Sequence, residues 1–119
     1  MEVSTKVRSC YSAPAQSAKL PMIPIPDYYR PLIDRIQQLK HKKNAIILVH
    51  NYQRPEIFEV ADFMGDSLGL CQQARATTAR MIIFSGVYFM AESAAILNPD
   101  KKVLIPDPES GCAMSDMIT

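Results

Sequence analysis

Apolar and polar positions alternate along the chain in a pattern that predicts strands separated by helices. Residues 45–49 are five consecutive apolar residues, three of them β-branched. Such a run predicts a strand that is buried on both faces. Shorter runs at residues 81–84 and 103–105 predict two more strands. Because helical patterns fill the intervals, we expect an α/β fold with three layers, in which helices cover both faces of a parallel sheet.

The first predicted helix spans residues 27–42. Asp27 is a suitable N-cap for it, and Pro31 falls in the first turn, where proline is tolerated. Its apolar residues recur at helical spacing and make one face: Leu32, Ile33, Ile36 and Leu39.

Three further helices follow from the same kind of spacing. Apolar residues at positions 57, 60, 61 and 64 predict an amphipathic helix over residues 55–64, and Gly65 is a typical residue after a helix end. Asp66 or Ser67 would cap the next helix, over residues 66–76, with Cys71 on its inward face. The third spans residues 89–97, and one more helix would begin after Cys112.

Residues 1–26 differ from the rest of the chain in composition. They contain serine, alanine and lysine without periodicity, and four prolines spread through their second half. We expect a mobile N-terminal tail here, with Cys10 inside it. Residues 27–119 would then form a single α/β domain, which is near the lower end of the usual domain size.

Composition excludes several classes of function. The net charge is +1, and the one basic run, residues 40–43, ends a predicted helix, so nucleic-acid binding has little support. No apolar run approaches the roughly 20 residues of a membrane span, and no secretory signal is evident. The three cysteines are odd in number and widely spaced. This spacing favours a reducing compartment, hence the cytoplasm, or a metal site.

Polar side chains follow each predicted strand. His50, Asn51 and Tyr52 come directly after the first strand, and Ser85 and Gly86 after the second. The segment 107–112, which includes Cys112, follows the third. Because the ends of parallel strands share one edge of the sheet, we expect these segments to converge there, beside helix N-termini that attract anions. A thiol at a helix N-terminus is biased toward thiolate, the form that binds metals.

Two catalytic interpretations compete at this edge. Residues 65–68, Gly-Asp-Ser-Leu, match the signature of an esterase family whose nucleophile would be Ser67. That family requires a strand directly before the motif and a downstream histidine, whereas a helix is predicted there and no histidine follows His50. A nucleophilic pair of Cys112 and His50 is compatible with the spacing, but no third, orienting residue is evident. In the simplest alternative, His50 binds a loop and Tyr52 covers the strand end.

Five motifs in order resemble the quinolinate synthase family. They occupy residues 50–56, 61–68, 84–92, 96–101 and 106–116, the last with Gly111, Cys112 and Asp116. The family more often has Cys and His where this chain has Ser85 and Tyr88, and Tyr where it has Asn51. The resemblance covers residues 44–119.

The resemblance implies an enzyme of de novo NAD biosynthesis that condenses iminoaspartate with dihydroxyacetone phosphate to quinolinate. Iminoaspartate would come from an L-aspartate-oxidising enzyme upstream. The family fold is three similar α/β domains around a pseudo-threefold axis, of which residues 27–119 would be the first, the second and third being absent here. One cysteine from each domain holds an oxygen-sensitive 4Fe–4S cluster.

The resemblance also implies roles for four residues of this chain. Cys112 matches the first cluster ligand, and His50 matches a ligand of the substrate carboxylate. Tyr52 matches a catalytic residue that lines the active site, and Ser67 a substrate-binding hydroxyl. The alternative from another class is a small α/β module that binds an anion at the same edge without catalysing a reaction.

Overall fold

The computed structural model describes residues 24–117 and contains one four-stranded parallel sheet. The strands are β1 (Ala45–His50), β2 (Phe63–Gly65), β3 (Met81–Ser85) and β4 (Lys102–Leu104). Their spatial order is β2-β1-β3-β4, so β1 and β3 are the central strands. The predicted α/β class and the parallel sheet are therefore confirmed.

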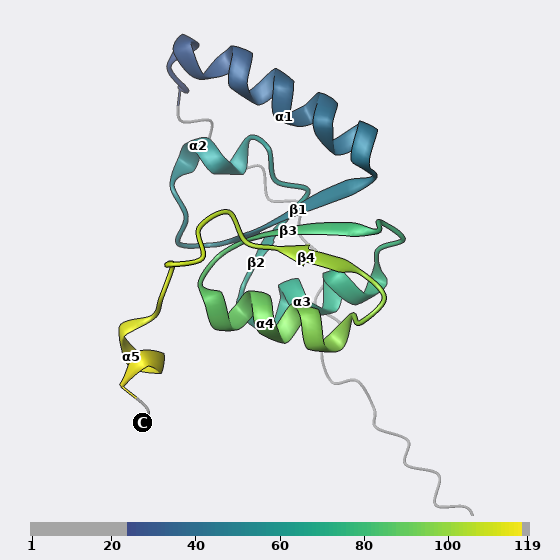
Figure 1. The fold of residues 1–119 in the computed structure, drawn as a ribbon. Helices are drawn as coiled ribbons and strands as arrows, with labels where there is room; N and C mark the ends of the chain where they lie inside the picture. The colour runs from purple at the N-terminus through teal and green to yellow at the C-terminus, as the bar shows by residue number, and fades with distance from the viewer. Residues whose placement is uncertain (1–23, 118–119) are drawn as a thin grey trace, which may run out of the picture.

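Helices cover both faces of this sheet, as the sequence predicts (Figure 1). The short 3₁₀ helix η1 (Asp27–Tyr29) leads into α1 (Arg30–Lys43). The remaining helices are α2 (Pro55–Phe58), α3 (Ser67–Ala76), α4 (Tyr88–Leu97) and α5 (Ala113–Asp116). α1 and α2 lie on one face of the sheet and α3 and α4 on the other, while α5 lies beyond the end of the sheet where the strands finish (Figure 1).

The two faces of the sheet have separate cores because successive side chains of a strand point to opposite sides. Leu48 of β1 points toward α3 and α4, where it joins Leu70, Phe84 and other buried residues. Ile47 and Val49 point the other way and pack against Val60, with α1 and α2 residues around them. The first core is the larger. Cys71 is buried in it, as the sequence predicts for a small apolar side chain.

The predicted helix over residues 55–64 is wrong. α2 ends at Phe58, and the chain then turns and adds β2 to the edge of the sheet, with Phe63 paired to Leu48 and Gly65 to His50. The helical spacing of apolar residues there reflects burial, since Val60 is buried against α1 whether or not the chain stays helical. Pairing with β1 gives hydrogen-bond partners to backbone groups that an isolated helical turn would leave unpaired. These tertiary hydrogen bonds override the local helix propensity.

Other boundaries also differ from the prediction. Asp27 does not cap α1; it lies in η1, and Tyr29 is the N-cap, without a side-chain hydrogen bond. On the apolar face of α1, Ile33 and Ile36 pack against the core, but Leu32 and Leu39 are 55% and 43% exposed. The tail predicted for residues 1–26 lies outside the described residues except for positions 24–26, so its mobility stays a prediction.

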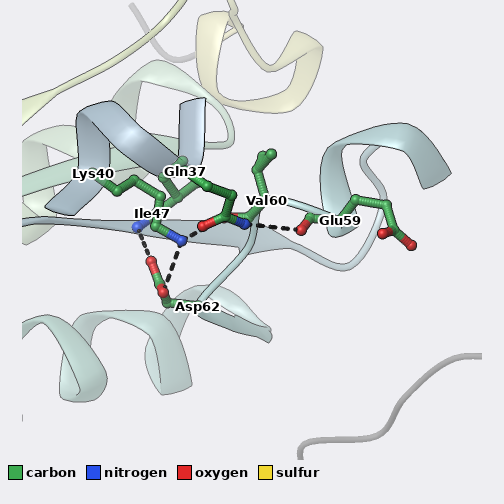
Figure 2. A network of polar contacts seen from close by, with 6 residues as sticks. All are labelled: Gln37, Lys40, Ile47, Glu59, Val60 and Asp62. Atoms are coloured by element: carbon green, nitrogen blue, oxygen red, sulfur yellow. Dashed lines mark hydrogen bonds and ion pairs between the residues drawn. The ribbon is translucent and has the colours of Figure 1, made fainter. Parts of the chain in front are cut away.

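A polar network fixes β2 to β1 and to α1 (Figure 2). The backbone N–H of Ile47 donates to Asp62 Oδ2 at 2.7 Å, and the N–H of Asp62 donates to the carbonyl of Ile47 at 2.9 Å. Lys40 Nζ lies 2.8 Å from Asp62 Oδ1 and donates to the carbonyl of Val60 at 2.9 Å. The Asp62 carboxylate therefore extends the β1–β2 ladder by one residue and binds the cation that α1 supplies.

The outer side of α4 is unusually apolar for a helix that faces solvent in this structure. Glu92 is the one charged residue of α4. Ile96 and Leu97 are 78% and 54% exposed, and Phe89 is also exposed. A helix that is apolar on all sides is typically buried in a larger assembly. Within residues 24–117 no helix is both long enough and apolar enough to cross a bilayer.

We expect Asp62→Ala to lower the free energy of unfolding by about 2–4 kcal/mol. The substitution leaves the N–H of Ile47 without its acceptor and the largely buried Lys40 ammonium without its counter-ion. Urea unfolding followed by circular dichroism measures the change.

Arg54→Ala is the matched control for Asp62→Ala. Arg54 also forms an ion pair, with Glu56 at 3.4 Å, but its side chain is 75% exposed. Its loss should change the unfolding free energy by less than about 0.5 kcal/mol. An Asp62→Ala variant no less stable than Arg54→Ala would show that the network does not hold β2 in place.

Candidate functional site

The strand order places a topological switch point at the carboxyl ends of β1 and β3, a region that we call the crevice. The chain leaves β1 toward α2 on one face of the sheet, and it leaves β3 toward α4 on the opposite face (Figure 1). Since these two strands are neighbours, their loops diverge from a common point at the end of the sheet. In open α/β sheets this topological switch point is where ligands bind.

The β1 side of the crevice is formed by His50 and Tyr52. The His50 and Tyr52 rings are tilted against each other with centroids 3.9 Å apart. The loop between them and α2 is held by two backbone hydrogen bonds, from Asn51 N–H to the carbonyl of Gly65 and from Gln53 N–H to that of His50, both 3.1 Å. These bonds hold the end of β1 and the loop after it, so the backbone that carries the two aromatic side chains has a defined position.

His50 is held as a neutral imidazole at physiological pH. Partial burial lowers the pKa of His50, and the negative charge of Asp66 opposes that effect in part. Its Nδ1 atom is buried and has no hydrogen-bond partner within residues 24–117. A neutral imidazole can donate or accept a hydrogen bond at Nε2, according to which nitrogen carries the proton. Either form suits a residue that binds or orients a polar ligand.

Tyr52 extends from the β1 loop to the α4 side of the crevice. Its ring is half-exposed, and its hydroxyl donates to Met90 Sδ at a distance of 3.9 Å. Met90 is buried in the core beneath α4. The contact links segments 38 residues apart in sequence. No feature of the sequence distinguished Met90 from an ordinary core methionine, so the sequence reasoning missed it.

The β3 side consists of Ser85, Gly86 and the segment that follows β4. Ser110 Oγ donates to the carbonyl of Gly86 at 3.1 Å, and the N–H of Tyr88 donates to the carbonyl of Ser110 at 2.7 Å. These bonds bring the segment after β4 to the end of β3, as the predicted convergence requires. They also occupy the first N–H of α4, so that helix N-terminus is less open to an anion than predicted.

Ser67 is the first residue of α3, directly after β2. Asp66 is the N-cap of α3, and its carboxylate accepts from the N–H of Gly69 at 2.7 Å. Asp66 thus carries the cap predicted for Asp66 or Ser67, and its charge also acts on His50. Because Gly65 pairs with His50 across the β1–β2 ladder, Ser67 begins its helix beside the β1 end of the crevice.

The structure corrects one premise of the argument against an esterase. The Gly65–Ser67 motif does follow a strand directly, because residues 63–65 form β2 rather than the end of a helix. The second premise stands: the chain's two histidines are His41 and His50, and both precede the motif. The serine therefore has no histidine base in the expected order, and hydrolysis by this route stays unsupported.

Cys112 is the N-cap of the one-turn helix α5 and makes no capping bond with its side chain. Its thiol is free and partly exposed. The N–H of Asp116 donates to the carbonyl of Cys112 at 2.9 Å, which closes the turn. The carboxylate of Asp116 folds back onto Gly111, where a Cβ atom would lie only 2.7 Å from Asp116 Oδ2. Glycine at position 111 therefore allows this tight arrangement just before the thiol.

The described residues fit at most one ligand position of an iron–sulfur cluster. Within residues 24–117, no group of three or more His, Cys, Asp or Glu side chains is arranged to bind a metal ion. Cys71 is enclosed in the core, and burial raises the pKa of its thiol, which disfavours the thiolate a metal needs. Cys112, partly exposed and unpaired at the end of the sheet where the strands finish, is sterically available. Further thiolates would have to come from outside these residues.

Comparison with known proteins gives a consistent result. A family model for quinolinate synthetase A protein matches residues 34–119. The quinolinate synthase of Pyrobaculum aerophilum is 59% identical over 88 residues, which are 74% of this chain and 29% of that protein. That of Thermus thermophilus is 58% identical over 87 residues, 73% of this chain and 28% of the relative. The quinolinate synthase of a Cyanothece species is 51% identical over 105 residues, 88% of this chain and 31% of the relative.

The chain thus spans less than a third of the length of these curated relatives. The matched residues nevertheless include all four strands of the sheet, the crevice between β1 and β3, and Cys112. Most of this chain is therefore matched by the family, at high identity. The chain belongs to the quinolinate synthetase A protein family.

Proposed function

We propose that this chain supplies the first part of a quinolinate synthase, which condenses iminoaspartate with dihydroxyacetone phosphate in de novo NAD biosynthesis. One observation carries the proposal. His50 and Tyr52 lie directly after β1 at the topological switch point, and this part of the chain lies wholly within the segment that the family matches. Ligand binding at such a point is the general behaviour of open α/β sheets.

The three polar side chains near the crevice have complementary tasks in this proposal. His50, whose neutral form is favoured by burial, donates a hydrogen bond to a substrate carboxylate from Nε2, because its Nδ1 is buried. The Ser67 hydroxyl, at the start of α3, binds a second polar group of the substrate beside the positive end of the helix dipole. Tyr52, held against His50 and Met90, presents its hydroxyl to the reacting substrate as the catalytic group.

Cys112 is the proposed ligand that this chain contributes to a 4Fe–4S cluster. When bound, such a cluster would supply Lewis-acid chemistry to the reaction. The residues of this chain would supply two further functions: they bind the carboxylate and orient the substrate. The other thiolates would come from polypeptide that, in the longer relatives, lies outside the matched segment.

The same proposal accounts for the apolar surface of α4. In a full-length relative, more than two thirds of the polypeptide lies outside the segment matched here. Burial of Ile96, Leu97 and Phe89 against that polypeptide would remove a large apolar area from water. The proposed setting is the cytoplasm, with iminoaspartate delivered by an L-aspartate-oxidising enzyme.

A chimera tests the proposed function and the role of Cys112 together. Residues 34–119 of this chain would replace the matching segment of the Thermus thermophilus quinolinate synthase. We expect the chimera, purified without oxygen, to form quinolinate from the two substrates. Cys112→Ser should lower bound iron and reduce activity by at least about tenfold, because an alcohol is a poor iron ligand. Iron analysis and a quinolinate assay measure both effects.

Cys71→Ala is the control for the cysteine substitution. Cys71 is buried in the core and makes no polar contact, so its replacement by alanine should leave the iron content unchanged. An active parent chimera whose Cys112→Ser variant kept its full iron content would refute the ligand assignment. A folded chimera that binds substrate-like dicarboxylates but forms no quinolinate would favour the alternative, an anion-binding module without catalysis.

The 119-residue chain alone should neither catalyse the reaction nor hold a stable cluster. Cys112 is the one accessible thiol among residues 24–117, and a 4Fe–4S cluster needs several. Its exposed apolar α4 surface should also cause self-association. Anaerobic reconstitution with iron and sulfide, followed by absorption spectroscopy and light scattering, measures these properties. A stoichiometric cluster on the monomeric chain would contradict the proposal.

The titration of His50 provides a test that needs no activity. Since burial lowers its pKa, the His50 ring in the folded chain should titrate below its ordinary value of 6.5. As the pH falls, the unfolded chain therefore becomes protonated at His50 before the folded chain does. The free energy of unfolding should decrease as the pH falls from about 6.5 through the lowered pKa of the folded chain. Asp66→Asn, which keeps a helix cap, should lower the pKa further. NMR titration in a His41→Gln background isolates the signal, and a pKa above 6.5 would be inconsistent with this site geometry.

A further inference from the structure

The Tyr52–Met90 contact is a structural feature that the proposed roles leave unexplained. The Tyr52 hydroxyl is 3.9 Å from Met90 Sδ and has no other hydrogen-bond partner within residues 24–117. Tyr52 lies on the loop after β1, and Met90 lies on α4, on the opposite side of the crevice. The contact therefore spans the switch point, and it determines where a half-exposed aromatic side chain places its polar group.

Met90 is a firm support for this hydroxyl because it belongs to the core. Its side chain is 8% exposed and it shares a buried cluster with Phe84, Leu48 and residues of α3. A thioether can accept a weak hydrogen bond, and its unbranched chain fills the space beneath the tyrosine. A half-exposed loop side chain is thus in contact with the larger core of the molecule.

Gly86 leaves room for Phe84, which shares the buried cluster of Met90. A Cβ atom at position 86 would lie 2.9 Å from Phe84 Cε1, so a larger residue there would displace the Phe84 ring. The same Cβ atom would lie 3.6 Å from Met90 Sδ, an ordinary van der Waals distance. Gly86 therefore acts on Met90 only through the packing of Phe84.

We propose that Met90 is a positioning residue, which holds the Tyr52 hydroxyl over the crevice between β1 and β3. Its consequence for catalysis rests on the proposed function, but the positioning itself does not. The competing interpretation is that Met90 fills space in the core and that its sulfur has no effect on Tyr52. Met90→Leu separates the two, because it conserves volume and removes the acceptor.

The contact is tested first in the 119-residue chain. Methionine labelled with ¹³C at its methyl group gives a signal for each of the seven methionines, and the Met90 signal is the one lost in Met90→Leu. Tyr52→Phe removes only the hydroxyl. We expect this variant to shift the Met90 signal and to leave that of Met64, on the opposite face of the sheet, unchanged. A Met90 signal that does not move in Tyr52→Phe would overturn the proposal, whatever the chain's activity.

The effect on catalysis is tested by a double-mutant cycle in the Thermus thermophilus chimera. Met90→Leu should lower kcat/KM about threefold to tenfold in the parent and have no further effect in a Tyr52→Phe background. Met64→Leu is the matched control and should leave kcat/KM unchanged in both backgrounds. Thermal unfolding of every variant shows whether a change in stability accounts for the loss.

The outcomes of the two experiments separate this proposal from the proposed function. Equal effects of Met90→Leu in both backgrounds would show that Met90 acts only through packing, which overturns the proposal. A parent chimera that is folded but inactive counts against the proposed function alone, and the methyl signal then decides whether Met90 positions Tyr52.

Discussion

Burial of β1 is the constraint on which the rest of the structure depends. Leu48 and Val49 are fully buried on opposite faces of the strand, and each contributes about 1.5–3 kcal/mol relative to exposure. A strand that is buried on both faces needs neighbours on both edges as well, since its backbone groups have no access to water. β3 satisfies one edge by regular pairing. The other edge is satisfied by three residues of β2 and by the carboxylate of Asp62.

This constraint explains which parts of the fold could be predicted from the sequence. Apolar runs, and apolar residues at helical spacing between them, identified six elements within a few residues: β1, β3, β4, α1, α3 and α4. They did so because each buried face of a strand or helix requires apolar residues at the spacing of that element. β2 could not be found in this way. It is three residues long, its burial is partial, and the residue that fixes it, Asp62, is a charged side chain that a local pattern assigns to solvent. Its partners are 15 and 22 residues away.

The candidate site was predictable to a similar extent. Polar residues directly after buried strands indicated His50 and Tyr52, and the parallel topology then required the ends of β1 and β3 to be neighbours. What the sequence could not supply was the side-chain geometry across the crevice. Met90 occupies a position with the spacing of a core residue, and it does lie in the core. Only its distance from the Tyr52 hydroxyl indicates that it also holds that hydroxyl in place. Asp66 likewise has the pattern of a helix cap, although its charge also acts on His50.

Because Met90 belongs both to the core and to the candidate site, substitutions in the core should affect the site. Protein cores are close-packed, so a small change of volume beneath the sheet is transmitted rather than absorbed. Phe84 and Met90 belong to one buried cluster, and the Tyr52 hydroxyl contacts Met90. A substitution in the α3–α4 core should therefore move the Tyr52 hydroxyl, whereas one in the α1–α2 core, on the other face of β1, should not. Tyr52 is half-exposed, but its hydroxyl is positioned by the same packing that holds β1 in place.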